Sequence, residues 1–271
     1  MTRPAEKENA RRLEQTGFTC VSLFSPDQLG TLLTVWNDFA RYHRGGFSST
    51  LLLDDGLRRD VHQALSRHAA PALARVMPSH RAIFLGFVNK DPGSQTPMPM
   101  HQDITMTEEE RRPGISLWAP LVDVDETNAC LRVVPGSHRL NRVPRAPGSP
   151  FPAADIEDAV TRDLARPVPL RAGEAVLIDQ RLFHASGRNE TPSARPVLAA
   201  VLIPRDQAAH YVHRTITGSI PELELFEMPD DFLLSCRLGS PPRSGFLKRT
   251  MPESVEPLSF ERIARASDVY C

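Results

Sequence analysis

The chain has 271 residues, 41% of them hydrophobic, and its 32 basic and 33 acidic side chains leave a formal net charge of −1. A chain of this length can bury a sizeable core and is most simply one domain with excursions. The balanced charge provides no overall field to attract nucleic acid or an anionic membrane, so the expected partner is a small molecule. Nothing in the sequence indicates the oligomeric state.

Four widely spaced cysteines, at positions 20, 130, 236 and 271, show neither a CxxC motif nor the density of a disulfide scaffold. The N-terminal residues are charged and lack the apolar stretch of a secretory signal. No uncharged apolar run reaches the roughly 18 residues that span a bilayer. We therefore expect a cytoplasmic protein without a membrane span.

The first part of the chain, to about residue 80, is expected to be helical and to pack outside a sheet. Residues 5–15 are charged and compatible with a helix. Residues 25–28 (Ser-Pro-Asp-Gln) combine a Ser N-cap, Pro at the first helical position and Gln at the third, ahead of an apolar pattern. A further helix is predicted over about 54–75.

From residue 81 the pattern changes to short apolar runs bounded by Pro, Gly and Asp, at 82–88, 114–123 and 196–203. Such runs are typical of buried strands. Several strands separated by turns favour a mainly β fold with flanking helices, a double-sheet jelly roll whose core covers about 81–205.

Two segments interrupt or follow this core. Residues 139–167 are rich in proline, and residues 206–258 begin with a mixed polar stretch and include Pro241-Pro242. Long connections of this kind are usually lids or disordered segments. We expect both to shape substrate access, with ordinary surface loops as the alternative, and we expect His210 and His213 on a mobile segment near the entrance. Residues 206–271 are treated as a C-terminal extension of the single domain.

The motif His101-Gln102-Asp103 lies between these predicted strands. Side chains alternate along an extended chain, so His101 and Asp103 point to one face and Gln102 to the other. With His184 they would form a facial triad of two histidines and one carboxylate, which leaves open positions and suits non-heme Fe(II). Zinc on the same side chains is the competing metal, and a stray histidine in a surface loop is the alternative to any metal site.

Further motifs surround these residues. In chain order they are Trp118-Ala-Pro-Leu-Val-Asp123, Asn128-Ala-Cys-Leu-Arg-Val-Val-Pro-Gly-Ser-His138, Gly173-Glu-Ala-Val-Leu-Ile-Asp179, His184-Ala-Ser-Gly-Arg-Asn189 and Arg195. With this order and spacing, over about residues 81–205, the chain resembles the phytanoyl-CoA dioxygenase family of Fe(II)/2-oxoglutarate oxygenases. The resemblance implies a double-stranded β-helix (jelly roll, cupin-like), with Fe(II) as the metal, 2-oxoglutarate as cosubstrate and O2 as co-reactant.

On this resemblance, His101, Asp103 and His184 are the catalytic metal ligands. Asp103 stands where the family's halogenating relatives have a small residue, which disfavours halogenation. Arg195 matches the family's arginine for the far carboxylate of 2-oxoglutarate, and a guanidinium suits that role because it can clamp a carboxylate with two parallel hydrogen bonds. Ser186, on the same strand face as His184, could donate a hydroxyl to the same carboxylate.

Three further residues are candidates for binding the cosubstrate. Ser116 could donate a hydroxyl from the strand over 114–123. Asn128 matches an asparagine that precedes the family's turn and either contacts the cosubstrate or sets that turn. Lys90 matches a lysine at the end of a strand and either reaches an anionic group or faces solvent. Ala129 replaces the family's usual Gly, so the backbone there lacks glycine's tolerance of positive φ.

The sequence thus predicts an oxidoreductase of the dioxygenase type, a non-heme Fe(II)/2-oxoglutarate-dependent oxygenase that hydroxylates or oxidatively cyclises a C–H site. The alternatives are an acyl-CoA or fatty acyl hydroxylase of the same family, a non-catalytic metal-binding jelly-roll sensor, and a zinc hydrolase on the same ligands. Charged loop residues favour a polar small molecule, and hence a tailoring step in the biosynthesis of a specialised metabolite: Arg142, Arg145, Arg205, Arg214, Arg243, Asp206 and Glu222.

Overall fold

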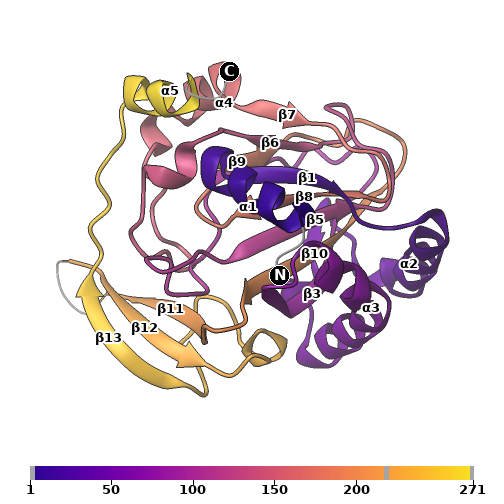
Figure 1. Ribbon diagram of the computed structural model, residues 1–271, viewed down its shortest axis with the longest axis horizontal. Coiled ribbons are helices and arrows are strands. Elements are labelled where there is room, and N and C mark those ends of the chain that lie inside the picture. Colours follow the sequence, from indigo (N-terminus) through magenta and orange to yellow (C-terminus); the bar gives the residue numbers. More distant parts are fainter. Residues whose placement is uncertain (1–3, 217–219, 269–271) are drawn as a thin grey trace.

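The computed structural model describes residues 4–216 and 220–268. At its centre two antiparallel sheets pack against each other (Figure 1). The larger sheet has the order β1 (Phe18–Ser22), β8 (Glu174–Asp179), β5 (Ile115–Pro120), β10 (Arg195–Pro204), β3 (His80–Lys90) and β2 (Phe47–Ser49). The smaller has the order β4 (Met98–His101), β9 (His184–Ser186), β6 (Leu131–Val133) and β7 (Arg166–Val168). This is the jelly roll that the sequence predicts.

The helices predicted in the first part of the chain are confirmed, although this part also supplies β1 and β2 to the large sheet, which the prediction of a helical region outside the sheet did not include. They are α1 (Pro4–Thr16), α2 (Pro26–Phe39) and α3 (Asp55–Val76). The expected cap starts α2, because Ser25 Oγ accepts from the Gln28 backbone N–H at 3.3 Å and Gln28 Oε1 accepts from the Ser25 backbone N–H at 3.0 Å. Each side chain thereby satisfies a backbone donor that the helix itself leaves free.

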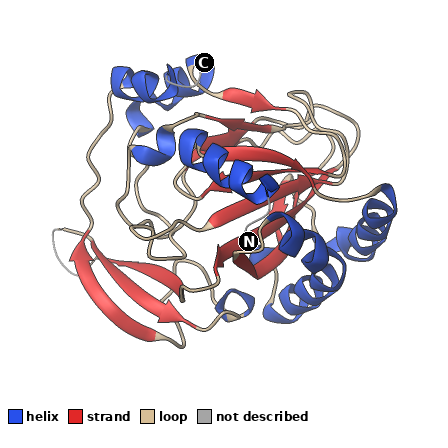
Figure 2. Cartoon of the chain, viewed as in Figure 1, coloured by secondary structure: helices blue, strands red, loops and turns tan. Residues whose placement is uncertain are grey.

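The central strands β3 and β10 separate two kinds of environment. Alternate side chains such as Leu85 and Leu198 join the buried residues of α2 and α3, including Leu32 and Leu65, in one core cluster. Side chains on the opposite face, such as Val197, join a second cluster with β5, β6 and β8. Figure 2 shows α2 and α3 together beside the central sheet. The helices therefore cover one face of the large sheet and leave the other face to the interior of the jelly roll.

The expectation of loops over residues 206–258 is wrong for much of that segment. It forms a three-stranded antiparallel sheet of β11 (Ala209–Thr215), β12 (Glu222–Met228) and β13 (Phe246–Pro252), at the lower left of Figure 1. His210 and His213 lie within β11 and are buried, rather than on a mobile segment. Five consecutive residues of this strand, from Ala209 to His213, are buried, so it lacks the alternation that marks a half-buried strand.

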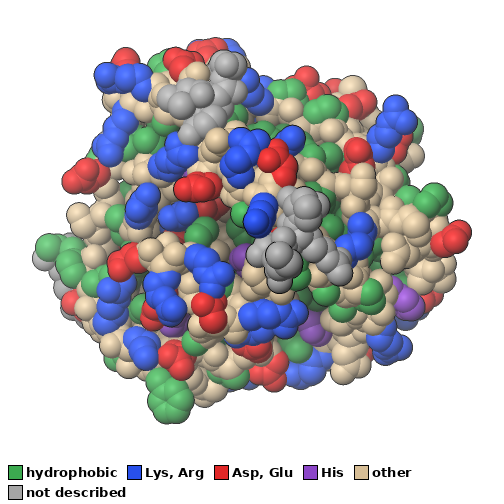
Figure 3. All heavy atoms as spheres, in the orientation of Figure 1, with side chains coloured by type: hydrophobic (Ala, Val, Ile, Leu, Met, Phe, Trp, Pro, Cys, Tyr) green, Lys and Arg blue, Asp and Glu red, His purple; other side chains and the backbone are tan. Residues whose placement is uncertain are grey.

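The remaining elements are short. The proline-rich segment over 139–167 contains α4 (Glu157–Asp163) and the 3-10 turn η4 (Ala154–Ile156), preceded by η3 (Ser137–Arg139). The other 3-10 turns are η1 (Ala40–Tyr42), η2 (Thr50–Leu52) and η5 (Phe232–Leu234), and the last helix is α5 (Phe260–Asp268). Among the described residues, no helix combines the length and apolar character needed to cross a bilayer. Basic and acidic side chains are interspersed on the face shown in Figure 3, as the near-zero net charge predicts.

Candidate metal centre

The three predicted ligands lie together. His101 is the last residue of β4 and His184 the first residue of β9, and the two are register partners in the small sheet. Asp103 follows two residues after His101. The ligand atoms of the three side chains all lie within 4.8 Å of one another, and Oδ1 of Asp103 is 3.8 Å from His101 Nε2 and 3.7 Å from His184 Nε2. Strand pairing thus brings together residues that are far apart in the sequence.

Backbone carbonyls fix the orientation of both imidazoles. His101 Nδ1 lies 2.8 Å from the carbonyl oxygen of Pro99, and His184 Nδ1 lies 2.9 Å from that of Leu182. A carbonyl can only accept, so in each ring Nδ1 carries the proton and donates it. Nε2 of each ring is left with an unprotonated lone pair, as a metal ligand requires.

The charges of the site favour the states that bind a metal. Burial lowers the pKa of His184 below its ordinary value, and the neighbouring His101 lowers it further, so the ring is neutral at neutral pH. Burial raises the pKa of Asp103, but His184, His101 and the Ser116 hydroxyl outweigh it, so the pKa lies below its usual range. A neutral imidazole and an ionised carboxylate are the states in which these groups coordinate metals.

Ser116 lies at the site but not in the expected role. Its Oγ donates to Oδ2 of Asp103 at 2.5 Å. The prediction that this hydroxyl binds the cosubstrate is therefore corrected, because the hydroxyl proton is already committed to the ligand carboxylate.

The triad lies on the wall of a cavity of about 210 Å³ between the two sheets. Arg195 and Ser186 line the same cavity, as predicted. The Arg195 side chain is buried, its Cζ lies 5.2 Å from the centre of the Trp118 ring, and its Nε and Nη1 have no hydrogen-bond partner among the described residues. Burial lowers the pKa of Arg195 to about 10, which still leaves it charged at neutral pH.

These residues fit the groups that the sequence predicts. A buried cation with unmatched donors is costly unless an anion joins it, and a carboxylate would pair with the Arg195 guanidinium along one edge, through Nη2 together with either Nε or Nη1. Two imidazole nitrogens and one carboxylate oxygen provide a donor set suited to Fe(II).

Lys90 and Asn128 are not among the residues that line this cavity. The Lys90 amine is buried and donates to the carbonyl oxygens of Ser186, at 3.3 Å, and Gly187. Burial, together with the nearby Arg195 charge, lowers its pKa to about 7. Lys90 thus holds the end of β9 and is neither free for an anion nor facing solvent.

Asn128 has the turn role that was the alternative to cosubstrate binding. Its Nδ2 donates to the carbonyl of Asp123 at 2.8 Å, and its Oδ1 accepts from the Asp125 backbone N–H at 2.9 Å. Ala129 then adopts φ 69° without being glycine. The backbone accepts the left-handed conformation there despite its cost of about 1–2 kcal/mol for a residue with a Cβ.

Sequence reasoning missed the polar contacts behind the ligands. Arg145, expected near the entrance, is buried in an ion pair with Glu109 and also contacts the backbone of Asp103. No motif or short spacing marks this pair, because it joins two different loops.

Comparison with known proteins agrees with the family and the fold. A family model for phytanoyl-CoA dioxygenase (PhyH) matches residues 37–197, more than half of the chain. Phytanoyl-CoA dioxygenase 1 of Oryza sativa subsp. japonica is 29% identical over 143 residues, which cover 52% of this chain and 51% of the relative. The chain spans about half the length, or less, of the first curated relatives that it matches.

Two solved structures have the same fold. The epimerase SnoN in complex with Fe3+, alpha ketoglutarate and nogalamycin RO is 21% identical with a TM-score of 0.57, and the match covers 95% of this chain and 97% of that one. HygX from Streptomyces hygroscopicus with nickel and 2-oxoglutarate bound is 15% identical with a TM-score of 0.56, over 76% and 88% of the two chains.

Fold and site together define a jelly-roll protein with a triad of two histidines and one carboxylate. The chain belongs to the phytanoyl-CoA dioxygenase family. The family and the fold predicted from the sequence are both confirmed.

Proposed function

We propose that the protein is a non-heme Fe(II)/2-oxoglutarate-dependent oxygenase that acts on a C–H bond of a small molecule. The observation that carries the proposal is one cavity that holds both the His101–Asp103–His184 triad and a buried arginine with unmatched donors. A metal-binding sensor or a zinc hydrolase needs the triad but not the cation. When bound, Fe(II) with 2-oxoglutarate and O2 would supply the oxidising power, with succinate and carbon dioxide as the products of the cosubstrate.

The protein's own residues would bind and orient. Arg195 would hold the far carboxylate of 2-oxoglutarate through its buried guanidinium, two donor nitrogens of which have no partner among the described residues, and Ser186, on the same cavity wall, would add a hydroxyl donor. The largely apolar wall keeps water away and strengthens these interactions. Orientation and exclusion of water are thus what the chain contributes.

The wall of the cavity also bears on the substrate. The charged loop residues that favoured a polar substrate are not among the lining residues. Apart from the triad, Arg195 and a few serines, the lining is apolar and includes Phe47, Leu51, Phe84, Met98 and Val201. We therefore propose that the reacting C–H bond belongs to an apolar part of the substrate, and that its polar groups remain outside this cavity.

Tailoring of a specialised metabolite, by hydroxylation or oxidative ring closure, is the leading proposal. Proteins of the same fold include the carbocyclase SnoK and the epimerase SnoN, both from nogalamycin biosynthesis. An acyl-CoA or fatty acyl hydroxylase is the second candidate, because an apolar wall also suits an alkyl chain. A screen for metabolites that stimulate succinate formation separates the two, and turnover confined to acyl substrates would reverse their order.

The oxygenase function itself can be tested without the substrate. Adding Fe(II) and 2-oxoglutarate in the absence of O2 should produce the visible metal-to-ligand charge-transfer band. Asp103→Ala should abolish the band. Arg195→Ala should show the band only at much higher concentrations of 2-oxoglutarate. Admitting O2 should then release succinate slowly. The proposal is wrong if the wild type gives no band, or if both variants behave like the wild type.

A further inference from the structure

The segment His101–Asp103, which carries two of the ligands, is held by hydrogen bonds on the side that faces away from the cavity. Gln102, between His101 and Asp103, points away from the triad and is buried. Its Nε2 donates to the carbonyl of Arg181 at 2.6 Å, and its Oε1 accepts from Nδ2 of Asn141 at 2.8 Å. These contacts tie the ligand segment to the loops that follow β6 and β8.

Asp103 itself lies beyond the end of β4 and therefore has no strand pairing to hold it. Two hydrogen bonds of its backbone replace the interstrand hydrogen bonds that a residue within a strand would have. Its N–H donates to the carbonyl of Gln180 at 2.9 Å. Its carbonyl accepts from Nε of Arg145 at 2.7 Å.

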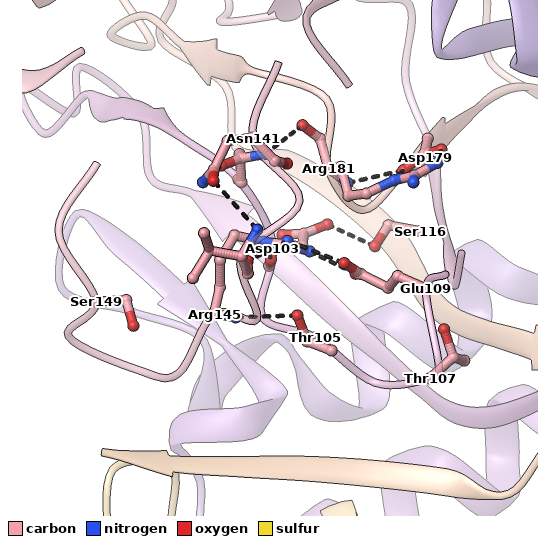
Figure 4. Close-up of polar contacts among 12 residues, drawn as sticks. Asp103, Thr105, Thr107, Glu109, Ser116, Asn141, Arg145, Ser149, Asp179 and Arg181 are labelled. Atoms are coloured by element: carbon pink, nitrogen blue, oxygen red, sulfur yellow. Dashed lines mark hydrogen bonds and ion pairs between the residues drawn. The ribbon is translucent and has the colours of Figure 1, made fainter. Parts of the chain in front are cut away.

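Arg145 is in turn fixed on both sides. Its Nη1 and Nη2 donate to the two carboxylate oxygens of Glu109, at 3.0 and 2.5 Å, and Figure 4 shows this pair beside Asp103. Its backbone N–H donates to Thr105 Oγ1 at 3.0 Å, and its carbonyl accepts from the Thr105 N–H at 3.0 Å. A planar guanidinium held by two parallel bonds to a carboxylate has little freedom to turn.

The pair is also dry. The side chains of Arg145 and Glu109 are only 7% and 6% exposed. Burying both charges costs desolvation that their attraction roughly balances, so such a pair adds little net stability. We therefore expect the Arg145–Glu109 pair to fix the position of the groups that it contacts more than it stabilises the fold.

We propose that Arg145 is a positioning residue for the metal site, held in place by Glu109. By binding the carbonyl of Asp103, it fixes the backbone from which that carboxylate is aimed at His101 and His184. The 139–167 segment therefore reaches the metal site through Arg145, from outside the cavity. This inference rests on the metal site of the proposed function and is independent of the substrate.

Co(II) is a suitable probe, because its visible spectrum reports the geometry of its ligands and its titration gives a Kd without turnover. Arg145→Gln should weaken Co(II) binding by about 10- to 100-fold, the usual effect of losing a group that orients a ligand, and should shift the spectrum. Arg145→Lys keeps the charge but not the forked geometry and should rescue binding in part. Glu109→Gln keeps the Arg145 guanidinium but removes the carboxylate that holds it. This variant should change the Co(II) Kd and spectrum in the same direction as Arg145→Gln, but to a smaller extent.

Arg58→Gln is the matched control. Arg58 is also buried, and its Nη1 donates to the carbonyls of Leu233 and Cys236 at 2.9 and 2.7 Å, but it does not line the cavity of the triad. This variant should lose stability and keep the wild-type Kd and spectrum.

Circular dichroism establishes first which variants are folded. Folded Arg145→Gln with the wild-type Kd and spectrum overturns the inference, as does an equal loss of Co(II) binding in Arg58→Gln. If Arg145→Gln does not fold, Arg145→Lys and Glu109→Gln decide by the same two readouts. A wild type that binds no Co(II) overturns both this inference and the proposed function, whereas wild-type binding with unchanged variants overturns this inference alone.

Discussion

Ser116 donates a hydrogen bond of 2.5 Å from its hydroxyl to Oδ2 of Asp103. Ser116 belongs to β5 of the large sheet and Asp103 follows β4 of the small sheet, so the bond joins the two sheets at the metal site. It leaves Oδ1 as the oxygen nearest both histidines. The serine thereby selects which carboxylate oxygen can meet a metal.

Ser116→Ala should weaken metal binding by about 10-fold, because it frees the ligand carboxylate to rotate. Ser116 also helps to keep the pKa of Asp103 low, so in the variant this pKa rises and protons compete with the metal at higher pH. Metal Kd measured from pH 5.5 to 8 should therefore show its largest loss at the acidic end. Ser116→Thr, which retains the hydroxyl, should behave like the wild type, and identical pH profiles for all three proteins would contradict the assigned role.

Arg195→Met should separate stability from cosubstrate binding. The buried guanidinium has two donors without partners, so replacing it with an apolar side chain should raise the free energy of unfolding in the absence of 2-oxoglutarate, by roughly 1–3 kcal/mol. The same change should abolish 2-oxoglutarate binding. Denaturation by urea and calorimetric titration measure the two effects, and a less stable variant that still binds 2-oxoglutarate would contradict this account.

His43 should make the protein sensitive to mild acid. The ring is buried between Trp36 and Phe87, and its nitrogens lie 3.4 and 3.3 Å from the hydroxyls of Ser48 and Thr50. Burial lowers its pKa to about 4, whereas the unfolded chain has the ordinary value near 6.5. The unfolded state therefore takes up the proton first as pH falls, and stability is lost between about pH 6.5 and 4.

The size of this effect is about 1–2 kcal/mol between pH 7 and pH 5. His43→Gln removes the titrating group, so the pH dependence of its unfolding free energy in urea should be smaller than that of the wild type by this amount. If the unfolding free energies of the two proteins depend equally on pH, the pKa of His43 does not differ between the folded and the unfolded state.

Two glycines offer opposite outcomes for the same substitution. A Cβ at Gly86, on β3 in the cavity wall, would come within 2.8 Å of both the Phe84 ring and Thr50 Cβ, so Gly86→Ala should cost about 1–3 kcal/mol. A Cβ at Gly30, within α2, meets nothing within 4 Å, so Gly30→Ala should stabilise by about 0.5–1 kcal/mol. Thermal unfolding of both variants measures the difference, and stabilisation by Gly86→Ala would be the contrary result.

Two of the three predicted ligands follow from local periodicity, and the resemblance of the surrounding motifs to the family added His184. Alternation along an extended chain predicts that His101 and Asp103 face one side, although Asp103 lies beyond the end of β4, and apolar runs mark β3, β5 and β10 clearly. Arg195 was predictable from its place at the start of an apolar run together with the family's pattern, and the structure buries it in the same cavity.

The hydrogen-bond partners of polar side chains were harder to predict from the sequence. The sequence places Ser116 on a strand near the site, but it does not show that the acceptor of its hydroxyl is the Asp103 carboxylate. Arg145 and Glu109 pair across two loops whose approach depends on the packing of the whole fold. Lys90 matches a family lysine at a strand end, for which an anionic partner and solvent were the two expectations, yet its amine donates to backbone carbonyls.

The C-terminal sheet was missed for a different reason. In β11 both faces of the strand are buried over residues 209–213, and one of the buried residues is His210. A strand buried on both faces does not alternate between apolar and polar residues, so the sequence carries no strand signal there. Ala129 shows the converse, because turn contacts from Asn128 hold it at positive φ where residue type alone argues against that conformation.

The three ligands are unequally sheltered. The side chain of His184 is 7% exposed, while those of His101 and Asp103 are 33% and 28% exposed. An ion bound here would be most enclosed on the side of His184 and least enclosed on the side of the other two ligands. Loading and loss of a metal would then take place past His101 and Asp103, so a molecule that covers these side chains would slow exchange of the ion and protect it from chelators.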